Sequence, residues 1–429
     1  MKGLNRFLVA CVALSLLCVA CQDDDAVIVP EEPVTEQEQE NSDYNEPAME
    51  TVAHEAKAIE LSASQKSINE GLRNFSWDLI SVMSELPTFD NENLIFSPLS
   101  LEIALAMLLN ATDDATLQES LSAMHLSGYN AEELNQYFSH FTTGITEADN
   151  VTRFSSSNSL WHDLRYDVQS RFKQALSDHY ACEFFPVVYG PETTDKINRW
   201  VEERTYGRID KIVGKTTHNV DFLHLLNAVY FRSPWSVSMS QLGKKPFTSF
   251  NGKVSTVEMF KGVCYEYLST PLYTATMLPF SNGAFGMFFI LPNDGVTFGE
   301  VIDNIKATGQ DFAKIHSSSK VVVTLPEFNA KSDVELSSVL DKLGCGNILN
   351  RGLDILSNLS GQTFGIKQIA NISVDHEGAE AAAVTNIWCG STGEPEPKPK
   401  YLTFDRPFIY GIIECSTGTP LFLGTISEL

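Results

Sequence analysis

Few residues of this chain have the types and spacing that enzyme catalysis requires. The run Ile212–Thr217 is similar to the end of a phosphate-binding loop, but that loop needs a glycine at position 209, where the chain has Ile209. The sequence contains neither a Gly-x-Ser-x-Gly nucleophile motif nor a His-Glu-x-x-His zinc motif, and its nine histidines are scattered singly. We therefore expect that the protein is not an enzyme and that it holds no metal or cofactor.

The cysteines do not form a metal or redox motif either. Of the eight, three lie near the N terminus, and none of the other five has the paired spacing of a zinc or redox site. Because five is odd, at least one thiol stays free unless a second chain supplies its partner, and we expect most to be buried free cysteines. These five are Cys182, Cys264, Cys345, Cys389 and Cys415.

The segment 377–399 is suited to a different event, a change of backbone pairing. After Glu377 it has Gly378 and a run of small, uncharged side chains broken only by Glu380, and it has no proline before Pro395. Such a segment can be exposed as a loop and later be added to the middle of a sheet, because no proline would interrupt the hydrogen bonds. The local pattern also allows a short helix or a linker. As a strand, its small or apolar face would be Ala379, Ala381, Ala383, Thr385, Ile387 and Cys389.

The composition predicts one large acidic domain. The 429 residues are 43% hydrophobic, and we find no internal repeat and no linker after residue 65 or so. The formal net charge of −25 argues against a nucleic-acid partner. We therefore expect a single domain over residues 61–429.

The N-terminal residues 1–20 have the pattern of a signal peptide. Lys2 and Arg6 precede the apolar stretch Phe7–Val19, which is too short to span a bilayer stably. Residues 19–21 look like a bacterial lipobox, with Cys21 as the lipidated residue. Residues 8–11 fit the lipobox consensus better but would leave almost no hydrophobic region before the cut, and a simple secretory peptide with a spare cysteine is the other alternative.

The residues after Cys21 predict a tether. Residues 22–60 carry 13 acids and one base, a composition that cannot bury enough apolar surface to fold. We therefore expect residues 21–60 to be an acidic disordered tether behind the lipidated cysteine. Residues 22–25 (Gln-Asp-Asp-Asp) resemble the surface-export tag of Bacteroidetes lipoproteins. This favours an outer-membrane lipoprotein at the cell surface or extracellular face, which contacts the membrane only through its lipid.

Several further motifs occur along the chain in an order that resembles a known family. Together with the segment 377–399, they resemble the serpins, the family of suicide protease inhibitors, over residues 68–428 or so. The resemblance implies an α+β serpin fold with three β-sheets and about nine helices. It also implies an exposed reactive-centre loop, near residues 377–400, and a metastable native state. The motifs are Asn93–Ser100, Leu225–Trp235, Leu325–Phe328, Leu356–Gly361, Phe404–Phe408, Ile413–Glu414 and Pro420–Gly424.

The resemblance also implies the mechanism and the partner. A target serine protease takes the loop as its substrate and forms a covalent acyl-enzyme with a monomeric inhibitor. The cut loop then inserts into the main sheet as an extra strand and traps the protease. Insertion needs a hinge with small side chains, which here comprises Glu377, Gly378, Ala379, Glu380, Ala381, Ala382 and Ala383.

The family's spacing predicts the reactive bond in two ways. The usual distance from Gly378 gives Thr392–Gly393, whereas counting back from Phe404 gives a bond about four residues later. Residues 394–400 alternate with proline, which favours polyproline II and resists most proteases. We therefore favour Thr392–Gly393.

The side chains before the cut indicate the class of target. A small residue at Thr392 suits elastase-like or subtilisin-like proteases, and Ile387 or Trp388 suits chymotrypsin-like ones. A cysteine protease is a second class of target. A trypsin-like protease is disfavoured, because the first basic residue of the loop is Lys398.

By resemblance, five further residues would control opening of the main sheet. Ser97, Ser100 and Asn227 match the polar "shutter" beneath the sheet, and Trp235 matches the "breach" where the loop first inserts. Gln368 stands where the family usually has a shutter histidine, and it retains both a donor and an acceptor. The simpler alternatives are that Ser97 is a helix N-cap and that Trp235 is an ordinary core residue.

The hinge region contains a second departure from the family pattern. His376 stands where a hinge glutamate is usual, although Glu377 is adjacent. Loss of that acid predicts loss of a salt bridge that holds the hinge. The rival function is a non-inhibitory serpin that acts as a binding or structural module, and the small hinge residues favour inhibition over it.

Overall fold

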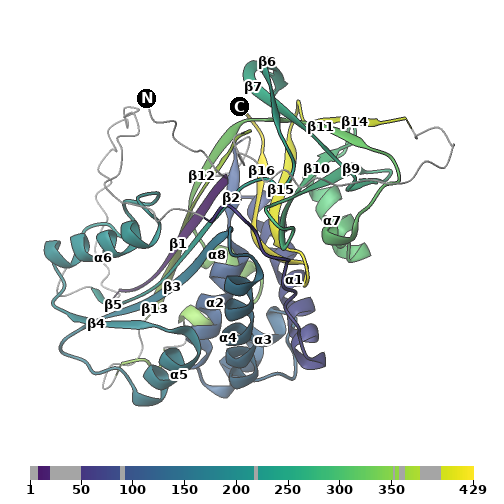
Figure 1. Cartoon of the computed structure of the whole chain (residues 1–429). Helices are drawn as coiled ribbons and strands as arrows, with labels where there is room; N and C mark the ends of the chain where they lie inside the picture. Colours follow the sequence, from purple (N-terminus) through teal and green to yellow (C-terminus); the bar gives the residue numbers. More distant parts are fainter. Residues whose placement is uncertain are drawn as a thin grey trace.

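Figure 1 shows the computed structural model of the chain. It describes residues 8–19, 50–86, 92–216, 221–350, 353–356, 363–376 and 398–429. Within these ranges no helix is both long and apolar enough to cross a bilayer.

The largest sheet contains six strands and has the N-terminal segment near its centre. Its strand order is β12-β13-β1-β5-β3-β4, and all neighbours are antiparallel except β3 and β4. The central strand β1 covers residues of the predicted signal peptide, so in the full-length chain this apolar stretch lies inside the fold. The bounds are β12 (Phe328–Glu335), β13 (Thr363–Val374), β1 (Leu8–Val19), β5 (Asp221–Ser233), β3 (Arg153–Asp163) and β4 (Glu183–Val187).

Two further sheets, one of six and one of four mostly shorter strands, complete the β-structure of the described residues. The second sheet has the order β2-β16-β15-β10-β9-β8, and the third has the order β14-β11-β7-β6. The strands of the second are β2 (Leu94–Phe96), β16 (Thr419–Ile426), β15 (Phe408–Glu414), β10 (Phe285–Pro292), β9 (Tyr273–Pro279) and β8 (Tyr267–Ser269). Those of the third are β14 (Lys400–Thr403), β11 (Val321–Pro326), β7 (Val254–Cys264) and β6 (Ser240–Thr248).

Several helices begin at a residue whose side chain caps the first turn. Ser62, Asn130 and Thr297 each start a helix with a capping box, in which a Gln or Glu three residues later returns the hydrogen bond. The bounds are α1 (Ala63–Ser84), α2 (Pro98–Leu109), α3 (Asp114–Ala123), α4 (Ala131–Ala148), α5 (Ser170–Tyr180), α6 (Pro191–Arg204), α7 (Phe298–Thr308), α8 (Ser337–Lys342) and α9 (Asn347–Asn350), with a 3-10 turn η2 (Phe312–Lys314).

Helix α2 forms the centre of the core beneath the largest sheet. All of its residues are buried, and it packs against β1, β5 and β16. A helix that is apolar on every side must be surrounded by protein. The described residues thus contain three sheets and nine α-helices, which confirms the predicted α+β class and architecture.

The last part of the predicted tether packs on the body. The His54 carbonyl accepts a hydrogen bond from Asn282 Nδ2 at 3.1 Å. The Ile59 N–H donates to Ser416 Oγ at 2.9 Å, and the side chains of Ile59 and Leu61 are buried. Over residues 50–61, therefore, the chain is an ordered arm and not a free tether.

The cysteines of the domain are reduced where they are described. Cys182, Cys264 and Cys345 are buried and Cys415 is partly buried, all as free thiols. Burial raises the pKa of Cys182 and of Cys345 to about 12 and that of Cys264 to about 11, which keeps these thiols protonated and unreactive. The prediction of buried free cysteines is confirmed for these residues, whereas Cys389 lies outside the described part.

Candidate functional site

The position between β13 and β5 is the candidate functional site, and we call it the slot. In the full-length chain it is filled by β1, which pairs with β13 from Val9 to Val19 and with β5 from Leu8 to Val19. Both pairings are antiparallel, and Ala13, Leu14 and Ser15 are buried. The slot therefore accepts an added strand of at least eleven residues along its whole length.

Two polar residues face each other across the slot with Leu14 between them. Leu14 lies opposite Gln368 of β13 and opposite Asn227 of β5. Residues directly opposite in a sheet share a face, so all three belong to one row. Gln368 and Asn227 are each 1% exposed, and the N-terminal end of α2 lies beneath them.

Gln368 connects β13 to α2 through the backbone of Ser97. The Ser97 N–H donates to Gln368 Oε1 at 2.9 Å, and Gln368 Nε2 donates to the Ser97 carbonyl at 3.1 Å. The Ser97 hydroxyl donates to the carbonyl of Leu421 in β16 at 2.7 Å. A primary amide can supply both bonds at once without a titratable group.

Asn227 connects β5 to the same helix end. The Ser100 hydroxyl donates to Asn227 Oδ1 at 2.5 Å, and Asn227 Nδ2 donates to Asn158 Oδ1 at 2.7 Å and to Ser156 Oγ at 3.1 Å. Both sides of the slot are thus held to α2 by buried side-chain hydrogen bonds. The structure brings together the four residues predicted for the shutter.

Ser97 also fits its simpler alternative. It is the N-cap of α2, its hydroxyl accepts from the Ser100 N–H at 3.2 Å, and Pro98 occupies the first helical turn. One residue therefore starts the helix and orients its backbone toward Gln368, so the two interpretations are compatible.

Trp235 joins the end of β5 to the end of β13. Its Nε1–H donates to the carbonyl of Asp375 at 3.0 Å, and its ring stacks on Phe280 with centroids 4.6 Å apart. It is 2% exposed, so it is a core residue as well as a contact at the predicted breach. Asp375 is where the chain leaves β13 toward the segment 377–399.

His376 retains an acid–base contact at the beginning of that segment. Its Nδ1 lies against the carboxylate of Glu327, and Gln241 Nε2 lies 3.3 Å from the same nitrogen. The hinge therefore keeps an ion pair here when His376 is protonated, with Glu327 as the anion and His376 as the cation, which differs from the predicted loss of a salt bridge.

Two buried ionisable groups lie close to the slot. Burial raises the pKa of Glu102, in α2, to about 8, although the Ser76 hydroxyl donates to its carboxylate at 2.9 Å. Burial lowers the pKa of His224, in β5, to about 3, and its Nδ1 lies 3.0 Å from the Tyr189 hydroxyl. Both groups are therefore neutral in the folded protein near pH 7.

Some of the residues that build this site were not found from the sequence. Ser156 and Asn158 belong to a Ser-Ser-Ser-Asn-Ser run inside β3, which lies between β5 and β4. A polar run of this kind is unusual in an interior strand and could have indicated a buried hydrogen-bond network. Glu327 and Gln241 had no such signal. The hinge residues 377–383, the bond Thr392–Gly393 and Cys21 lie outside the described residues.

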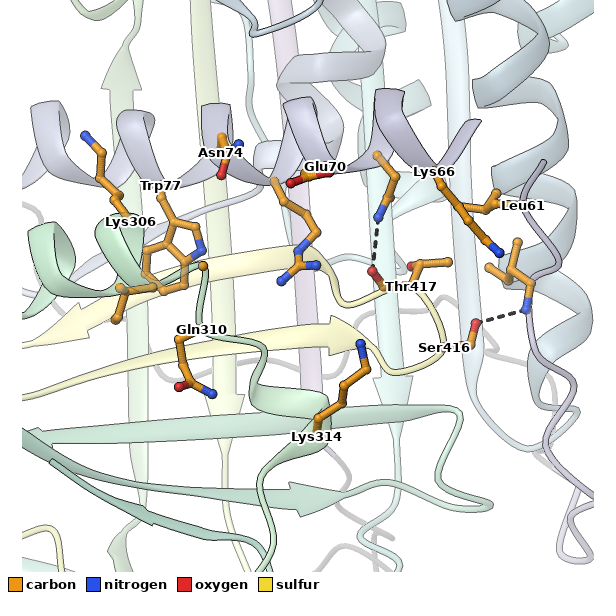
Figure 2. A pocket seen from close by; sticks show the side chains of 15 residues that line it. Leu61, Lys66, Glu70, Asn74, Trp77, Lys306, Gln310, Lys314, Ser416 and Thr417 are labelled. Atoms are coloured by element: carbon orange, nitrogen blue, oxygen red, sulfur yellow. Dashed lines mark hydrogen bonds between the residues drawn. The ribbon is translucent and has the colours of Figure 1, made fainter. Parts of the chain in front are cut away.

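A surface pocket is a second candidate, and Figure 2 shows its lining. It has a volume of about 300 Å³ between α1, the end of α7 and the turn between β15 and β16. Lys306 pairs with Asp78 at 2.6 Å and Lys314 pairs with Asp311 at 2.7 Å, so two of its cations are neutralised within the protein. We therefore assign the functional site to the slot, where the predicted residues converge.

Comparison with known proteins identifies the architecture. The family model "Serpin (serine protease inhibitor)" matches residues 70–429, which is most of the chain. The chain belongs to the serpin family. Serpins are generally protease inhibitors that bind target proteases, rather than catalytic enzymes.

Individual relatives are similar over most of their lengths. An uncharacterized serpin-like protein of Thermococcus kodakarensis is 29% identical over 84% of this chain and 85% of its own length. Serine protease inhibitor 2 of Anopheles gambiae is 26% identical over 84% of this chain and 92% of its own. Among solved structures, the native state of the thermophilic serpin tengpin has a TM-score of 0.70 at 24% identity and covers 88% of this chain and 97% of its own.

Proposed function

We propose that this serpin inhibits serine proteases by covalent trapping, with insertion of its reactive-centre loop into the slot. The observation that carries the proposal is the slot itself. An inserted loop must run antiparallel to β13, which it follows in the chain, and β1 has this orientation there. The same strand is antiparallel to β5 on its other edge.

The slot also supports the energetics of trapping. A strand inserted between β13 and β5 pairs on both edges, and each hydrogen bond contributes about 0.5–1.5 kcal/mol net. Burial of the small loop face adds about 25 cal/mol per Å² of apolar area. An insertion of about 14 residues moves the attached protease by about 45 Å.

The covalent chemistry belongs to the protease. Its serine Oγ attacks the carbonyl carbon of Thr392, and the bond from that carbon to the Gly393 nitrogen breaks. The Gly393 amine leaves with a proton from the protease's own general acid, and an ester joins Thr392 to the protease. Insertion before hydrolysis then preserves the ester. The proposed targets are elastase-like and subtilisin-like proteases, and cysteine proteases are a second class.

The slot must be empty before the loop can insert. We infer that maturation achieves this, because a cut before Cys21 removes all of β1. Lipid on Cys21 would then anchor the inhibitor to the outer membrane, and the charged residues that follow favour an outward-facing position. The multiple acyl chains of a bacterial lipoprotein anchor stably, whereas a single chain binds only reversibly.

A protease panel tests the inhibitory function. The chain from residue 21, with Cys21→Ala, contains the whole family match and is incubated with elastase, subtilisin, chymotrypsin and trypsin. We expect an SDS-resistant complex with elastase or subtilisin, joined at Thr392. Ala381→Arg is the matched control, because a buried charge opposes insertion and converts the inhibitor into a substrate. If every protease cuts the loop and stays active, the proposal is wrong.

Cell fractionation tests the location. The wild-type protein is expected in the outer-membrane fraction with a lipid on Cys21, detectable by mass spectrometry. Cys21→Ala is expected to release it or to block its maturation. A variant that still fractionates with membranes, together with a wild type that carries no lipid, would contradict the anchor and leave the inhibitory proposal intact.

A further inference from the structure

The side chain of His376 lies at the junction between the largest sheet and the segment 377–399. The pairing of β12 with β13 ends at Phe328 and Val374. Glu327 and His376 lie just beyond this last pair, with side chains that are 23% and 18% exposed. Water therefore screens a charge here less than at an open surface, so the protonation of His376 has a larger effect on its contacts.

One ring nitrogen of His376 has two partners of opposite character. Its Nδ1 lies against the carboxylate of Glu327, which accepts a hydrogen bond, and 3.3 Å from Nε2 of Gln241, which donates one. A charged imidazole carries a proton on both nitrogens, so its Nδ1–H donates to Glu327. A neutral imidazole with its proton on Nε2 has a lone pair on Nδ1, which accepts from Gln241. The protonation of the ring therefore selects the partner.

The two partners lie on different elements around the junction. Glu327 directly precedes β12, whereas Gln241 belongs to β6 of the third sheet. The strand order β12-β13-β1-β5 places β12 and the slot on opposite edges of β13. Contact with Glu327 thus holds residue 376 on the side of β13 that faces away from the slot. A charge-assisted hydrogen bond is about twice as strong as a neutral one, so residue 376 is held more firmly there when the ring is charged.

The elements packed around the junction carry charged groups of both signs. Asp375 and Leu429, which carries the terminal carboxylate, line a cavity of about 360 Å³ together with Glu327. The Glu258 carbonyl of β7 accepts the Glu327 N–H at 2.9 Å. Cations on these elements include Lys244 of β6, opposite Glu258, and Arg232 of β5, across β1 from Ser373. Among these side chains, only histidine has an ordinary pKa between pH 5.5 and 8.

We propose that His376 is a pH-dependent switch that controls insertion of the reactive-centre loop into the slot. The inference rests on the proposed inhibitory function and adds a regulation to it. When the ring is charged, its pair with Glu327 holds the first part of the loop away from the slot. Insertion is then slower, so water hydrolyses more of the acyl-enzyme before the protease is trapped. When the ring is neutral, the ion pair is lost and trapping is more efficient.

The stoichiometry of inhibition tests the proposal, because it counts the inhibitor molecules consumed for each protease trapped. The chain from residue 21 with Cys21→Ala, which we call the parent chain, is titrated against elastase at pH 5.5 and at pH 8. At pH 5.5, His376→Gln is expected to lower the stoichiometry about threefold, because it removes the charge and keeps hydrogen bonding. At pH 8 the two proteins should agree. The pH dependence of elastase itself cancels, because both are measured at the same pH.

Three further variants test the assignment of the partner. Glu327→Gln removes the anion and should match His376→Gln at pH 5.5. His376→Lys keeps a charge at both pH values, so it should raise the stoichiometry at pH 8 about threefold above that of the parent chain. The matched control is His125→Asn, which removes a contact of 2.6 Å with Asp78 of α1 and should behave as the parent chain. Asparagine tolerates the φ of 60° at this position.

A second measurement separates failure of the switch from failure of the inhibitor. Amide exchange at residues 374–376 is followed in the uncut parent chain, without any protease. At pH 5.5 it should be about threefold slower than in His376→Gln, and at pH 8 the two should be equal. This result supports the switch even if no covalent complex forms, in which case the inhibitory function is wrong. Equal exchange at pH 5.5 would overturn the switch, whether or not the chain traps elastase. Unequal exchange with equal stoichiometry would also overturn it, because His376 would then hold the junction without controlling insertion.

Discussion

Ser97 and Gln368 hold each other through two reciprocal hydrogen bonds, from the Ser97 N–H to Gln368 Oε1 at 2.9 Å and from Gln368 Nε2 to the Ser97 carbonyl at 3.1 Å. The amide side chain thus acts as a neighbouring peptide group would. It joins β13 to the N-terminal end of α2 at the edge of the slot. Because neither group titrates, this connection does not depend on pH.

Gln368→Leu should therefore destabilise the protein strongly. It leaves the buried N–H and carbonyl of Ser97 without these partners, at about 1–3 kcal/mol for each unsatisfied group. Urea unfolding should show a loss of about 2–4 kcal/mol in the free energy of unfolding. The exposed Gln136→Leu on α4 is the matched control and should change it by less than about 0.5 kcal/mol. A loss for Gln368→Leu as small as that of the control would show that the pair does not stabilise the fold.

The buried Glu102 makes the free energy of unfolding depend on pH, and the direction of this dependence can be predicted. Its pKa is raised from 4.5 to about 8 by burial, so between these values the folded protein binds a proton that the unfolded chain releases. Stability from this group is complete below pH 4.5 and is lost as the pH rises through 8, by at most about 1.4 kcal/mol per pH unit. Glu102→Gln should flatten the dependence.

His224 changes the free energy of unfolding with pH in the opposite direction and over a different pH range. Its pKa is lowered from 6.5 to about 3, so its contribution is present above pH 6.5 and is lost as the pH falls toward 3. Denaturation between pH 6.5 and 8 therefore isolates Glu102. In that window the wild type should lose about 2 kcal/mol that Glu102→Gln keeps. Parallel curves for the two proteins would contradict the assignment.

The sequence predicted features that depend on neighbouring residues better than it predicted contacts between residues far apart in the chain. Ser97-Pro98 predicted the start of α2, because a cap is encoded within a few residues. The partner of Gln368 lies 271 residues earlier, and only the family resemblance brought the two together. The sequence near Glu327 gives no signal of its contact with His376, because that contact depends on the antiparallel pairing that places the start of β12 beside the end of β13.

The N-terminal segment shows a further limit of sequence patterns. A continuous apolar run is typical of a signal peptide and equally of a strand buried on both faces. Leu8–Val19 satisfies both descriptions, so the pattern alone could not predict its position between β13 and β5. The position of this segment depends on the edges of β13 and β5, because the backbone N–H and C=O groups along those edges need hydrogen-bond partners.

Trp235→Phe should loosen the chain where it leaves β13. The substitution keeps an aromatic ring to stack on Phe280 but removes the Nε1–H that donates to the Asp375 carbonyl. We expect a loss of about 1–2 kcal/mol in unfolding free energy and faster amide exchange at residues 374–376. Trp200→Phe is the control, because Trp200 Nε1 donates to the partly exposed Glu183 away from the slot. Unchanged exchange at residues 374–376 would show that the indole does not hold this junction.

The last prediction concerns competition between the leader and the loop for the slot, and it rests on the proposed function. The full chain with Cys21→Ala, purified without export, should melt at a higher temperature than the chain from residue 21 and should form far less SDS-resistant complex. Leu14→Asp places a carboxylate at a 1% exposed position between Gln368 and Asn227, so it should expel β1 and restore trapping to the full chain. Val52→Asp, at a 75% exposed position on the N-terminal arm, should not restore trapping.

A peptide with the sequence of Leu8–Val19, but not a scrambled one, should raise the melting temperature of the shorter chain. If the full and shorter chains have equal melting temperatures and trap the protease equally, β1 does not compete for the slot. If the peptide stabilises the shorter chain but that chain traps no protease, β1 still binds in the slot and the proposed inhibitory function is wrong.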